Sequence, residues 1–285
     1  MTMVGSRIRL ETNERLIAAL VLAEPGIQGL PPSLPIIHVT NARRALSALV
    51  NAFAHRIERN IPFTMGPDNS IHPSAVVEGV LEGGVTVGAG AIISKGCFVG
   101  RGSRIEPRAV LMPQTQTGRN CVIQSGAVIG CAGFGFFDDG GPADPIPHLA
   151  GVILGDNCFI GANTVIAAGV LHPTLLGSGC KLDSHVQIAH NVRLGNDCLM
   201  ASQSGIAGST VVGDGFRMGG AASVAGHLRL GKNVGVAARS GVTKDLADHA
   251  VVAGFPAMPI RSWRRRETLL RRMEKDGFLP QGEWA

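Results

Sequence analysis

Aliphatic residues recur at every sixth position along most of the chain. Counting back from Val242 in steps of six gives twelve consecutive aliphatic or methionine positions, ending at Leu176. A second series runs from Leu81 to Ile129 with only Thr117 polar, and a third from Leu154 to Ile166. Each unit of six is predicted to form a short strand and a turn. Three units would form one triangular coil, which buries its aliphatic residues only by stacking on its neighbours.

The cysteines follow the same register. With the aliphatic residue in the first place of each unit, Cys131 stands in the third place and the other five cysteines stand in the fifth, which is the second small, inward-facing position. The chain has no pair of cysteines two residues apart, so zinc and disulfide sites are disfavoured. We expect the cysteines to pack in the core as small apolar residues.

Two segments interrupt the repeat. Residues 134–151 follow Gly133 and begin with Phe-Gly-Phe, and they contain clustered glycines and prolines. This composition predicts a loop that leaves the prism and is able to cover a groove. The register also slips around His172-Pro173. Both interruptions are expected to project from an otherwise smooth surface.

The two ends of the chain have helical patterns. Apolar residues keep helical spacing from Asn41 onward, where Thr40 or Asn41 can cap the helix, and an earlier helix is expected over Glu14–Ala23. Pro259 suits the first position of a C-terminal helix. The expected division is a short, partly helical N-terminal region (1–70), a prism (71–258) and a basic C-terminal helix and tail (259–285).

Composition narrows the class of protein. Of 285 residues, 45% are hydrophobic and 16% charged, which supplies enough apolar material for a large core and excludes general disorder. The apolar run Leu16–Ala23 is too short to span a membrane, and the first residues do not resemble a secretory signal. These features predict a soluble, cytoplasmic protein without a membrane span, and we expect no nucleic-acid partner.

Histidine and glycine positions suggest a catalytic edge. His190 stands in the third place of its unit of six. The residue eighteen positions later is Gly208, and the residue eighteen positions after that is Gly226, which His227 follows directly. These residues should stack about 4.8 Å apart per coil. A neutral imidazole is a common general base, and a glycine amide can donate to an oxyanion. Acyl transfer is therefore feasible, with Asp183 orienting the His190 ring, although solvated surface histidines would give the same spacing.

Several segments resemble a known family. Leu182–Val192 (Leu-Asp-Ser-His-Val-Gln-Ile-Ala-His-Asn-Val), Cys121–Gly130, Gly133–Phe136, Gln203–Thr210 and Gly219–His227 are similar to the UDP-3-O-acylglucosamine N-acyltransferases of lipid A biosynthesis. The resemblance covers about Ile71 to Ala257. It implies an all-β solenoid, the left-handed parallel β-helix of hexapeptide-repeat acyltransferases.

The resemblance also implies an activity. The family forms homotrimers that move a 3-hydroxyacyl chain from acyl carrier protein to the amine of a UDP-linked glucosamine. The donor carries 4′-phosphopantetheine, and no permanently bound cofactor or metal is expected. His190 matches the catalytic base, Gly208 the oxyanion donor and His227 a second functional histidine. The remaining residues that we assign to substrate binding are Gly226, Phe134, Phe136, Gln187 and Asn191.

The chain departs from the family pattern at three places. Ala167-Ala168-Gly169 stands where the family usually has Asp-Arg-Gly, and Ile146-Pro147-His148 stands where it usually has Ile-Pro-Gln. The N-terminal region is also shorter than the family's nucleotide-binding domain. A coenzyme A-dependent enzyme with another amino-sugar acceptor is therefore an open alternative. Two further alternatives are a non-catalytic scaffold and a metal-dependent prism of the γ-carbonic anhydrase type, which the spacing of His185 and His190 suggests.

The positive charge is concentrated at one end. The chain has a net charge of +5, and the segment from Arg261 to Lys275, with seven basic and two acidic residues, accounts for all of it. Acyl carrier proteins are strongly acidic, so we expect this segment to steer the donor toward the enzyme. The residues proposed for that contact are Arg264, Arg265 and Arg266.

Overall fold

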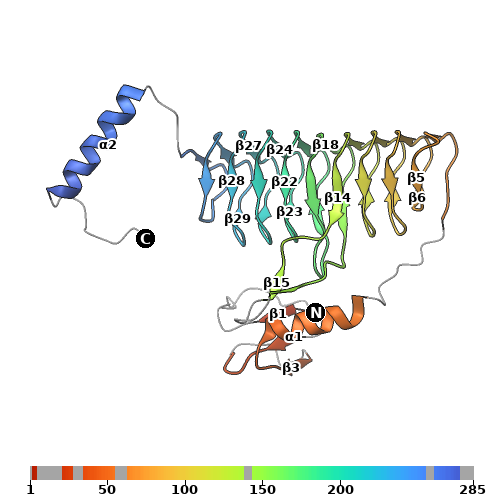
Figure 1. Ribbon diagram of the computed structural model, residues 1–285, viewed down its shortest axis with the longest axis horizontal. Helices are drawn as coiled ribbons and strands as arrows, with labels where there is room; N and C mark the ends of the chain where they lie inside the picture. The colour runs from red at the N-terminus through yellow and green to blue at the C-terminus, as the bar shows by residue number, and fades with distance from the viewer. Residues whose placement is uncertain are drawn as a thin grey trace.

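The chain forms a long prism of short parallel strands, with an N-terminal region beside it and a helix beyond its C-terminal end (Figure 1). This arrangement is taken from a computed structural model, which describes residues 2–4, 21–27, 35–54, 63–137, 143–254 and 260–276. Among these residues, no helix is long and apolar enough to cross a membrane.

Three parallel sheets form the sides of the prism. The ten-stranded sheet contains β4 (Ser70–Ile71), β7 (Thr86–Val87), β10 (Arg104–Ile105), β13 (Val122–Ile123), β18 (Phe159–Ile160), β21 (Lys181–Leu182), β24 (Leu199–Met200), β27 (Arg217–Met218), β30 (Gly235–Val236) and β32 (Val251–Val252). The nine-stranded sheet contains β5 (Val76–Val77), β8 (Ile92–Ile93), β11 (Val110–Leu111), β14 (Val128–Cys131), β19 (Val165–Ala167), β22 (Gln187–Ile188), β25 (Gly205–Ile206), β28 (Ser223–Val224) and β31 (Gly241–Val242). The eight-stranded sheet contains β6 (Val80–Leu81), β9 (Phe98–Val99), β12 (Gln116–Thr117), β17 (Val152–Leu154), β20 (Thr174–Leu176), β23 (Arg193–Leu194), β26 (Val211–Val212) and β29 (Arg229–Leu230).

The repeat of six explains this architecture. In each two-residue strand the first-place residue points inward, as at Ile188, and the residue before it lies on the outer face. Equivalent residues pair directly between coils, as Ile188 does with Ile206 eighteen residues later. Stacking thus removes a continuous column of aliphatic side chains from water. The predicted left-handed β-helix is confirmed.

The cysteines are all free thiols, and the five in fifth places are buried. Cys121, Cys158, Cys180 and Cys198 form a column through successive coils, and their thiols donate to turn carbonyls such as that of Gly155. Hydrogen bonds to neighbouring thiols, and then burial, raise the pKa of Cys158 and Cys180 to about 12. The thiols are packed in the core, as expected from their register.

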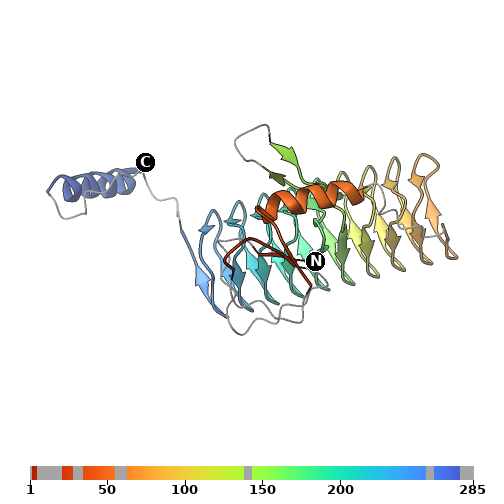
Figure 2. The same cartoon turned by 90° about the horizontal axis from the view of Figure 1, so that it is seen from below.

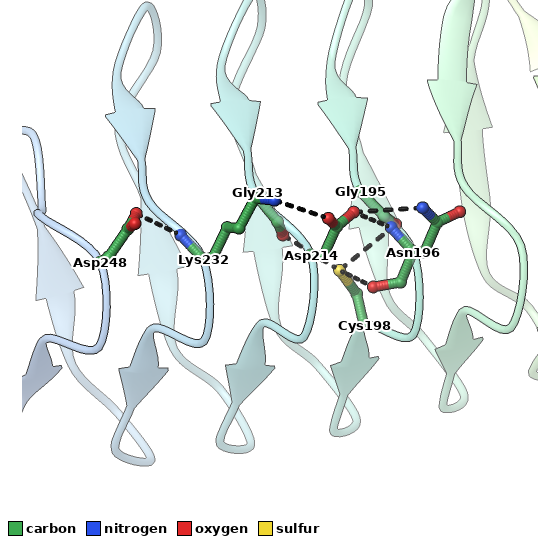
Figure 3. Close-up of polar contacts among 7 residues, drawn as sticks. All are labelled: Gly195, Asn196, Cys198, Gly213, Asp214, Lys232 and Asp248. Atoms are coloured by element: carbon green, nitrogen blue, oxygen red, sulfur yellow. Dashed lines mark hydrogen bonds and ion pairs between the residues drawn. The ribbon is translucent and has the colours of Figure 1, made fainter.

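Side chains cap the turns along the edge between the eight- and ten-stranded sheets (Figure 3). The amide of Asn196 donates to the Asp214 carboxylate at 2.8 Å, and the amide of Lys232 donates to Asp248 at 2.8 Å. The Asn196 amide also lowers the pKa of Asp214. In these pairs, the side chain in the third place of one unit accepts a hydrogen bond from the backbone amide in the third place of the equivalent unit of the preceding coil.

Both interruptions leave the prism at the corner between the nine- and eight-stranded sheets. The first lies between β14 and β17 and contains an antiparallel hairpin of β15 (Phe136–Phe137) and β16 (Asp144–Pro145). The second lies between β19 and β20. The two are joined by backbone hydrogen bonds from Leu149 to Val170 and from Ala150 to Gly169, each 3.0 Å.

The N-terminal region is more than the helix predicted from Asn41. Its parallel sheet contains β1 (Thr2–Val4), β2 (Val21–Ala23) and β3 (Ile36–His38), and α1 (Ala42–Ala54) follows. The Asn41 side chain accepts the Arg44 amide at 2.9 Å and caps α1. The helix predicted over Glu14–Ala23 is wrong at its end, because Val21–Ala23 is the buried central strand; residues 5–20 lie outside the described residues.

A small second core joins the N-terminal region to the interruptions. Leu22, Leu46 and Val50 are buried against Leu149 of the loop and against Val170 and Leu171 of the second interruption. Helix α1 and the hairpin lie on the same side of the prism (Figures 1 and 2).

Helix α2 (Ile260–Lys275) lies beyond the end of the prism in both views. Arg264, Arg265 and Arg266 are exposed, and so are Leu269 and Leu270. Pro259, proposed as its first residue, lies outside the described residues.

Candidate active site

The corner that carries both interruptions also carries the candidate catalytic column; we call it the loop edge. The Ser209 amide donates to the His190 carbonyl at 3.0 Å, and the His227 amide donates to the Gly208 carbonyl at 3.0 Å. His190, Gly208 and Gly226 therefore stack in successive coils, as their spacing predicted. A β-carbon added to Gly208 would lie 2.7 Å from both Cε1 and Nε2 of His190, so the ring lies directly against the Gly208 backbone.

Asn191 fixes the orientation of the His190 ring. Its Oδ1 accepts the Val170 amide at 3.3 Å, while its Nδ2 donates to the His172 carbonyl at 2.8 Å, and this pair of bonds sets which way the side-chain amide points. The same Oδ1 lies 3.2 Å from Nδ1 of His190. Because Oδ1 can only accept, the network assigns the hydrogen of the neutral ring to Nδ1. The lone pair is then on Nε2, beside Gly208.

The Gly208 amide is available as a hydrogen-bond donor. On the edge drawn in Figure 3, the third-place amides of Asn196 and Lys232 are satisfied by the side chains of Asp214 and Asp248 in the next coil. The residue one coil after Gly208 is Gly226, which has no side chain. Within the described part of the chain, nothing accepts a hydrogen bond from the Gly208 amide. The column of glycines thus leaves a donor beside the base.

The loop places a second histidine against the first. The rings of His148 and His190 have centroids 5.2 Å apart and planes at 67°. Sequence comparison singled out His148 only as a departure from the family pattern. Because the loop lies outside the repeat, the register gave no means of placing this residue.

Exposed aromatic and apolar surface lies next to the histidines. Phe134 is 88% exposed, and its ring centroid is 5.1 Å from that of Phe136 in an edge-to-face contact. On the far side of the hairpin, a cavity of about 580 Å³ lies between α1 and β15–β16. The residues that line it are Arg44, Ser47, Ala48, Asn51, Phe137, Asp144 and Pro145. Phe134 and Phe136 are thus accessible for the contacts with substrate that the sequence predicted.

The other predicted binding residues lie nearby but make few contacts. His227 is exposed on the loop edge with a φ of 62°, one coil beyond Ser209. Gln187 is exposed on the outer face of β22, three residues before His190. Asp138 and Asp139 of the loop lie outside the described residues.

Known proteins share sequence and fold with this chain. The family model described as the hexapeptide repeat of succinyl-transferase matches residues 151–186. The UDP-3-O-acylglucosamine N-acyltransferase of Pseudomonas syringae pv. syringae is 38% identical over 225 residues, covering 72% of this chain and 64% of that protein. The protein of the same name from Ectopseudomonas mendocina is 46% identical over 177 residues, covering 62% of this chain and 50% of that protein.

This chain is similar in sequence to UDP-3-O-acylglucosamine N-acyltransferases. It spans between half and two thirds of the length of these relatives. Two solved structures share the fold. LpxA from Acinetobacter baumannii matches with a TM-score of 0.55 and 21% identity over 78% of this chain and 86% of that one. A UDP-N-acetylglucosamine acyltransferase from Campylobacter jejuni matches with a TM-score of 0.56 and 22% identity over 74% and 82%.

One residue predicted from its spacing in the sequence does not lie beside His190 in this structure. Asp183 lies at the corner between the ten- and nine-stranded sheets, whereas His190 lies on the loop edge. Its carboxylate instead accepts the Ser184 amide at 2.7 Å. The expectation that Asp183 orients the His190 ring is therefore wrong within one chain, and Asn191 occupies that position. His185 lies at the same corner as Asp183, so it does not share a site with His190 in one chain.

Asp183 lines a different concave surface. An open groove of about 640 Å³ follows the outer face of the ten-stranded sheet and is mainly apolar, with Phe159 and the exposed Leu199 and Val251 along it. Within the described part of the chain, no group of three metal-ligating side chains is arranged to hold an ion. The proposed donor-binding residues Arg264 and Arg265 line a smaller groove of about 370 Å³ on α2, together with Thr268, Leu269 and Arg272. Arg266 lies 3.5 Å from Glu267.

Proposed function

We propose that this protein is an N-acyltransferase that moves a 3-hydroxyacyl chain from acyl carrier protein to the amine of a UDP-linked, 3-O-acylated glucosamine. The observation that carries this proposal is the contact between the His190 ring and the Gly208 backbone, with an unprotonated Nε2 beside an uncapped amide. The similarity to N-acyltransferases over the prism supports the choice of acceptor.

The reaction follows from this pair of groups. The acceptor amine attacks the thioester carbonyl while Nε2 of His190 takes a proton from the amine. The carbonyl oxygen becomes an oxyanion, which the Gly208 amide stabilises. The intermediate then expels the pantetheine thiolate, and His190 returns the proton to that sulfur. The products are an amide and a free thiol, and Asn191 holds the ring in the required tautomer throughout.

The remaining residues have binding roles in this proposal. Phe134 and Phe136 offer apolar contact to the acyl chain or the sugar, and His227 binds the donor or acceptor one coil away. The cavity beside α1 supplies Arg44 and Asn51 for the diphosphate and nucleoside of the acceptor. A homotrimer would place the apolar groove of one copy against the loop edge of another, and this would also bring a neighbour's Asp183 toward His190. The cytoplasmic location stays a prediction.

A second acceptor is supported by one observation. Ala167 and Ala168, which replace the family's Asp-Arg pair, are buried beside the second interruption. The charged contacts available to the relatives are missing there, which favours a different amino sugar, with coenzyme A as the alternative donor.

Mass spectrometry of reaction products tests both candidates. The purified protein would be offered 3-hydroxyacyl thioesters of acyl carrier protein and of coenzyme A, each with a panel of UDP-amino sugars. We expect an amide product with UDP-3-O-acylglucosamine and the carrier-protein donor. A product only with another amino sugar would replace the acceptor, and absence of product with every pair would refute the acyltransferase assignment.

Substitution of the base tests the mechanism. His190→Ala should lower turnover roughly 10²- to 10⁴-fold, the usual contribution of a general base. Light scattering should return a trimer for both the wild type and the variant. The matched control is His249→Asn, an exposed histidine with a φ of 62° on another edge. Activity of His190→Ala within a few-fold of wild type would remove His190 from the mechanism.

A further inference from the structure

His148 is half-buried, and both of its ring nitrogens are shielded from solvent although neither is paired. Within the described part of the chain, Nδ1 and Nε2 are both shielded from solvent and neither finds a hydrogen-bond partner. A neutral imidazole carries one donor and one acceptor, and leaving both unpaired in the interior destabilises the folded protein. Unpaired buried groups in native proteins call for an explanation. Here the unpaired ring faces His190, with the two ring centroids 5.2 Å apart.

The loop backbone is shaped to admit this ring. A β-carbon on Gly133 would lie 2.8 Å from Nε2 of His148 and 2.8 Å from Cβ of His190, and a β-carbon on Gly135 would lie 2.9 Å from Cε1 of His148. The Ile146 amide donates to the Gly135 carbonyl at 2.9 Å, which closes the hairpin just before His148. The two glycines therefore allow the histidines to approach each other.

The electrostatics of the pair favour one protonation state. Burial lowers the pKa of His148, and a charge on His190 lowers it further. The Ile146 carbonyl acts weakly in the opposite direction without forming a well-aligned hydrogen bond. Among the titratable groups of the described residues, His190 is the one whose charge acts on His148. The pKa of His148 therefore lies below that of a free imidazole, which favours the neutral ring near pH 7.

We propose that His148 is a positioning residue for His190: its neutral ring packs against the base, holds Nε2 toward Gly208, and couples the two histidines so that the pair carries at most one proton during turnover. This inference rests on the proposed function. It assigns His148 no contact with substrate, because its ring nitrogens are buried. The proton taken from the acceptor amine stays on His190 until the thiolate receives it.

Coupling predicts a distinctive dependence on pH. The first proton on the pair removes the base, and a second proton is added only at lower pH. The acid limb of kcat/KM should therefore steepen from a slope of one toward a slope of two on a logarithmic plot. In His148→Gln, which restores the amide usual in the family, one titrating group remains and the slope should stay at one.

Two variants separate positioning from simple filling of space. His148→Leu replaces the imidazole with an apolar side chain of similar size and so removes the unpaired nitrogens. We expect its kcat to fall about 10- to 100-fold while its melting temperature stays equal to or above that of wild type. His148→Gln should recover part of kcat, and His249→Asn should behave as wild type. A loss of melting temperature in His148→Leu that parallels the loss of kcat would mean that His148 only fills space.

Nuclear magnetic resonance gives a readout that does not depend on activity. With ¹³C-labelled histidine, the His148 signal of the full-length wild-type protein should titrate only below the pH range of a free imidazole, because burial and the charge of His190 lower its pKa. An unshifted titration of the His148 signal would overturn the proposal even if acyl transfer were confirmed. Absence of acyl transfer with the lowered His148 titration intact would instead refute the proposed function and leave the pairing standing.

Discussion

Replacing Gly226 by asparagine should switch off the Gly208 amide. On the edge between the eight- and ten-stranded sheets, the side chain of Asn196, in the third place of its unit, accepts a hydrogen bond from the Ser178 amide of the preceding coil at 2.9 Å. The introduced asparagine would stand in the same relation to Gly208, eighteen residues earlier, and would accept its amide. Gly226 has no positive φ, so the backbone tolerates a side chain. A β-carbon there would lie 3.1 Å from the Gly208 carbonyl oxygen, which is tight but open to a small adjustment.

The magnitude follows from the role of the amide. Loss of one oxyanion donor costs about 10²- to 10³-fold in kcat, or about 2.7 to 4 kcal/mol of transition-state stabilisation. Gly226→Asn should show this loss with a melting temperature equal to or above that of wild type, because it satisfies a backbone donor. The assay is release of free pantetheine thiol at saturating acceptor. Gly226→Ala is the matched control, since it introduces the same β-carbon without an acceptor, and its kcat should stay within about tenfold of wild type.

Equal losses in the asparagine and alanine variants would refute the reasoning, because the β-carbon alone would then account for the effect. Wild-type activity in Gly226→Asn, with the new hydrogen bond seen in a crystal structure, would show that the Gly208 amide is not the oxyanion donor.

Three further predictions concern the core, the thiols and the basic helix. Ile188→Ala should cost about 2–5 kcal/mol of unfolding free energy in chemical denaturation, because Ile188 is fully buried between Ile166 and Ile206; a cost under about 1 kcal/mol would contradict the packing. With a pKa of about 12, only about one part in 10⁴ of Cys158 is thiolate at pH 8. Iodoacetamide should therefore leave Cys158 unmodified in the native protein and label the half-buried Cys131 first, which mass spectrometry would report. Replacing Arg264, Arg265 and Arg266 with glutamate should raise the KM for a carrier-protein donor and leave that for a pantetheine thioester unchanged; equal effects on both donors would mean that the arginines are structural.

The prism could be predicted because its sequence signal and its packing have the same period. A first-place residue such as Ile188 is inward in every coil, and the pairing with Ile206 follows from the spacing alone. The stacking of His190 on Gly208 was predictable for the same reason. Asp183 was misassigned although the register itself excludes it: it stands in a second place, one corner earlier along the coil than His190.

The parts outside the repeat were harder to predict. Val21–Ala23 ends the apolar run Leu16–Ala23, whose periodicity does not separate a buried strand from a buried helix, and only pairing with β1 and β3 decides it. The position of His148 depends on the path of the loop. That path is set by non-local contacts, such as those of Leu149 with the N-terminal core, which no local pattern encodes.

The interruptions reveal how tolerant the fold is of added chain. β12 pairs with β17 across 37 residues instead of the usual eighteen, and β17 pairs with β20 across 22, yet the register of the strands on either side continues. The length of an insertion at this corner is therefore free to change during evolution. A lineage can exchange the loop that carries His148, and with it the specificity of the site, while every coil of the scaffold stays in place. Grafting loops from related enzymes between residues 131 and 152 would be a direct route to transferases for other acceptors.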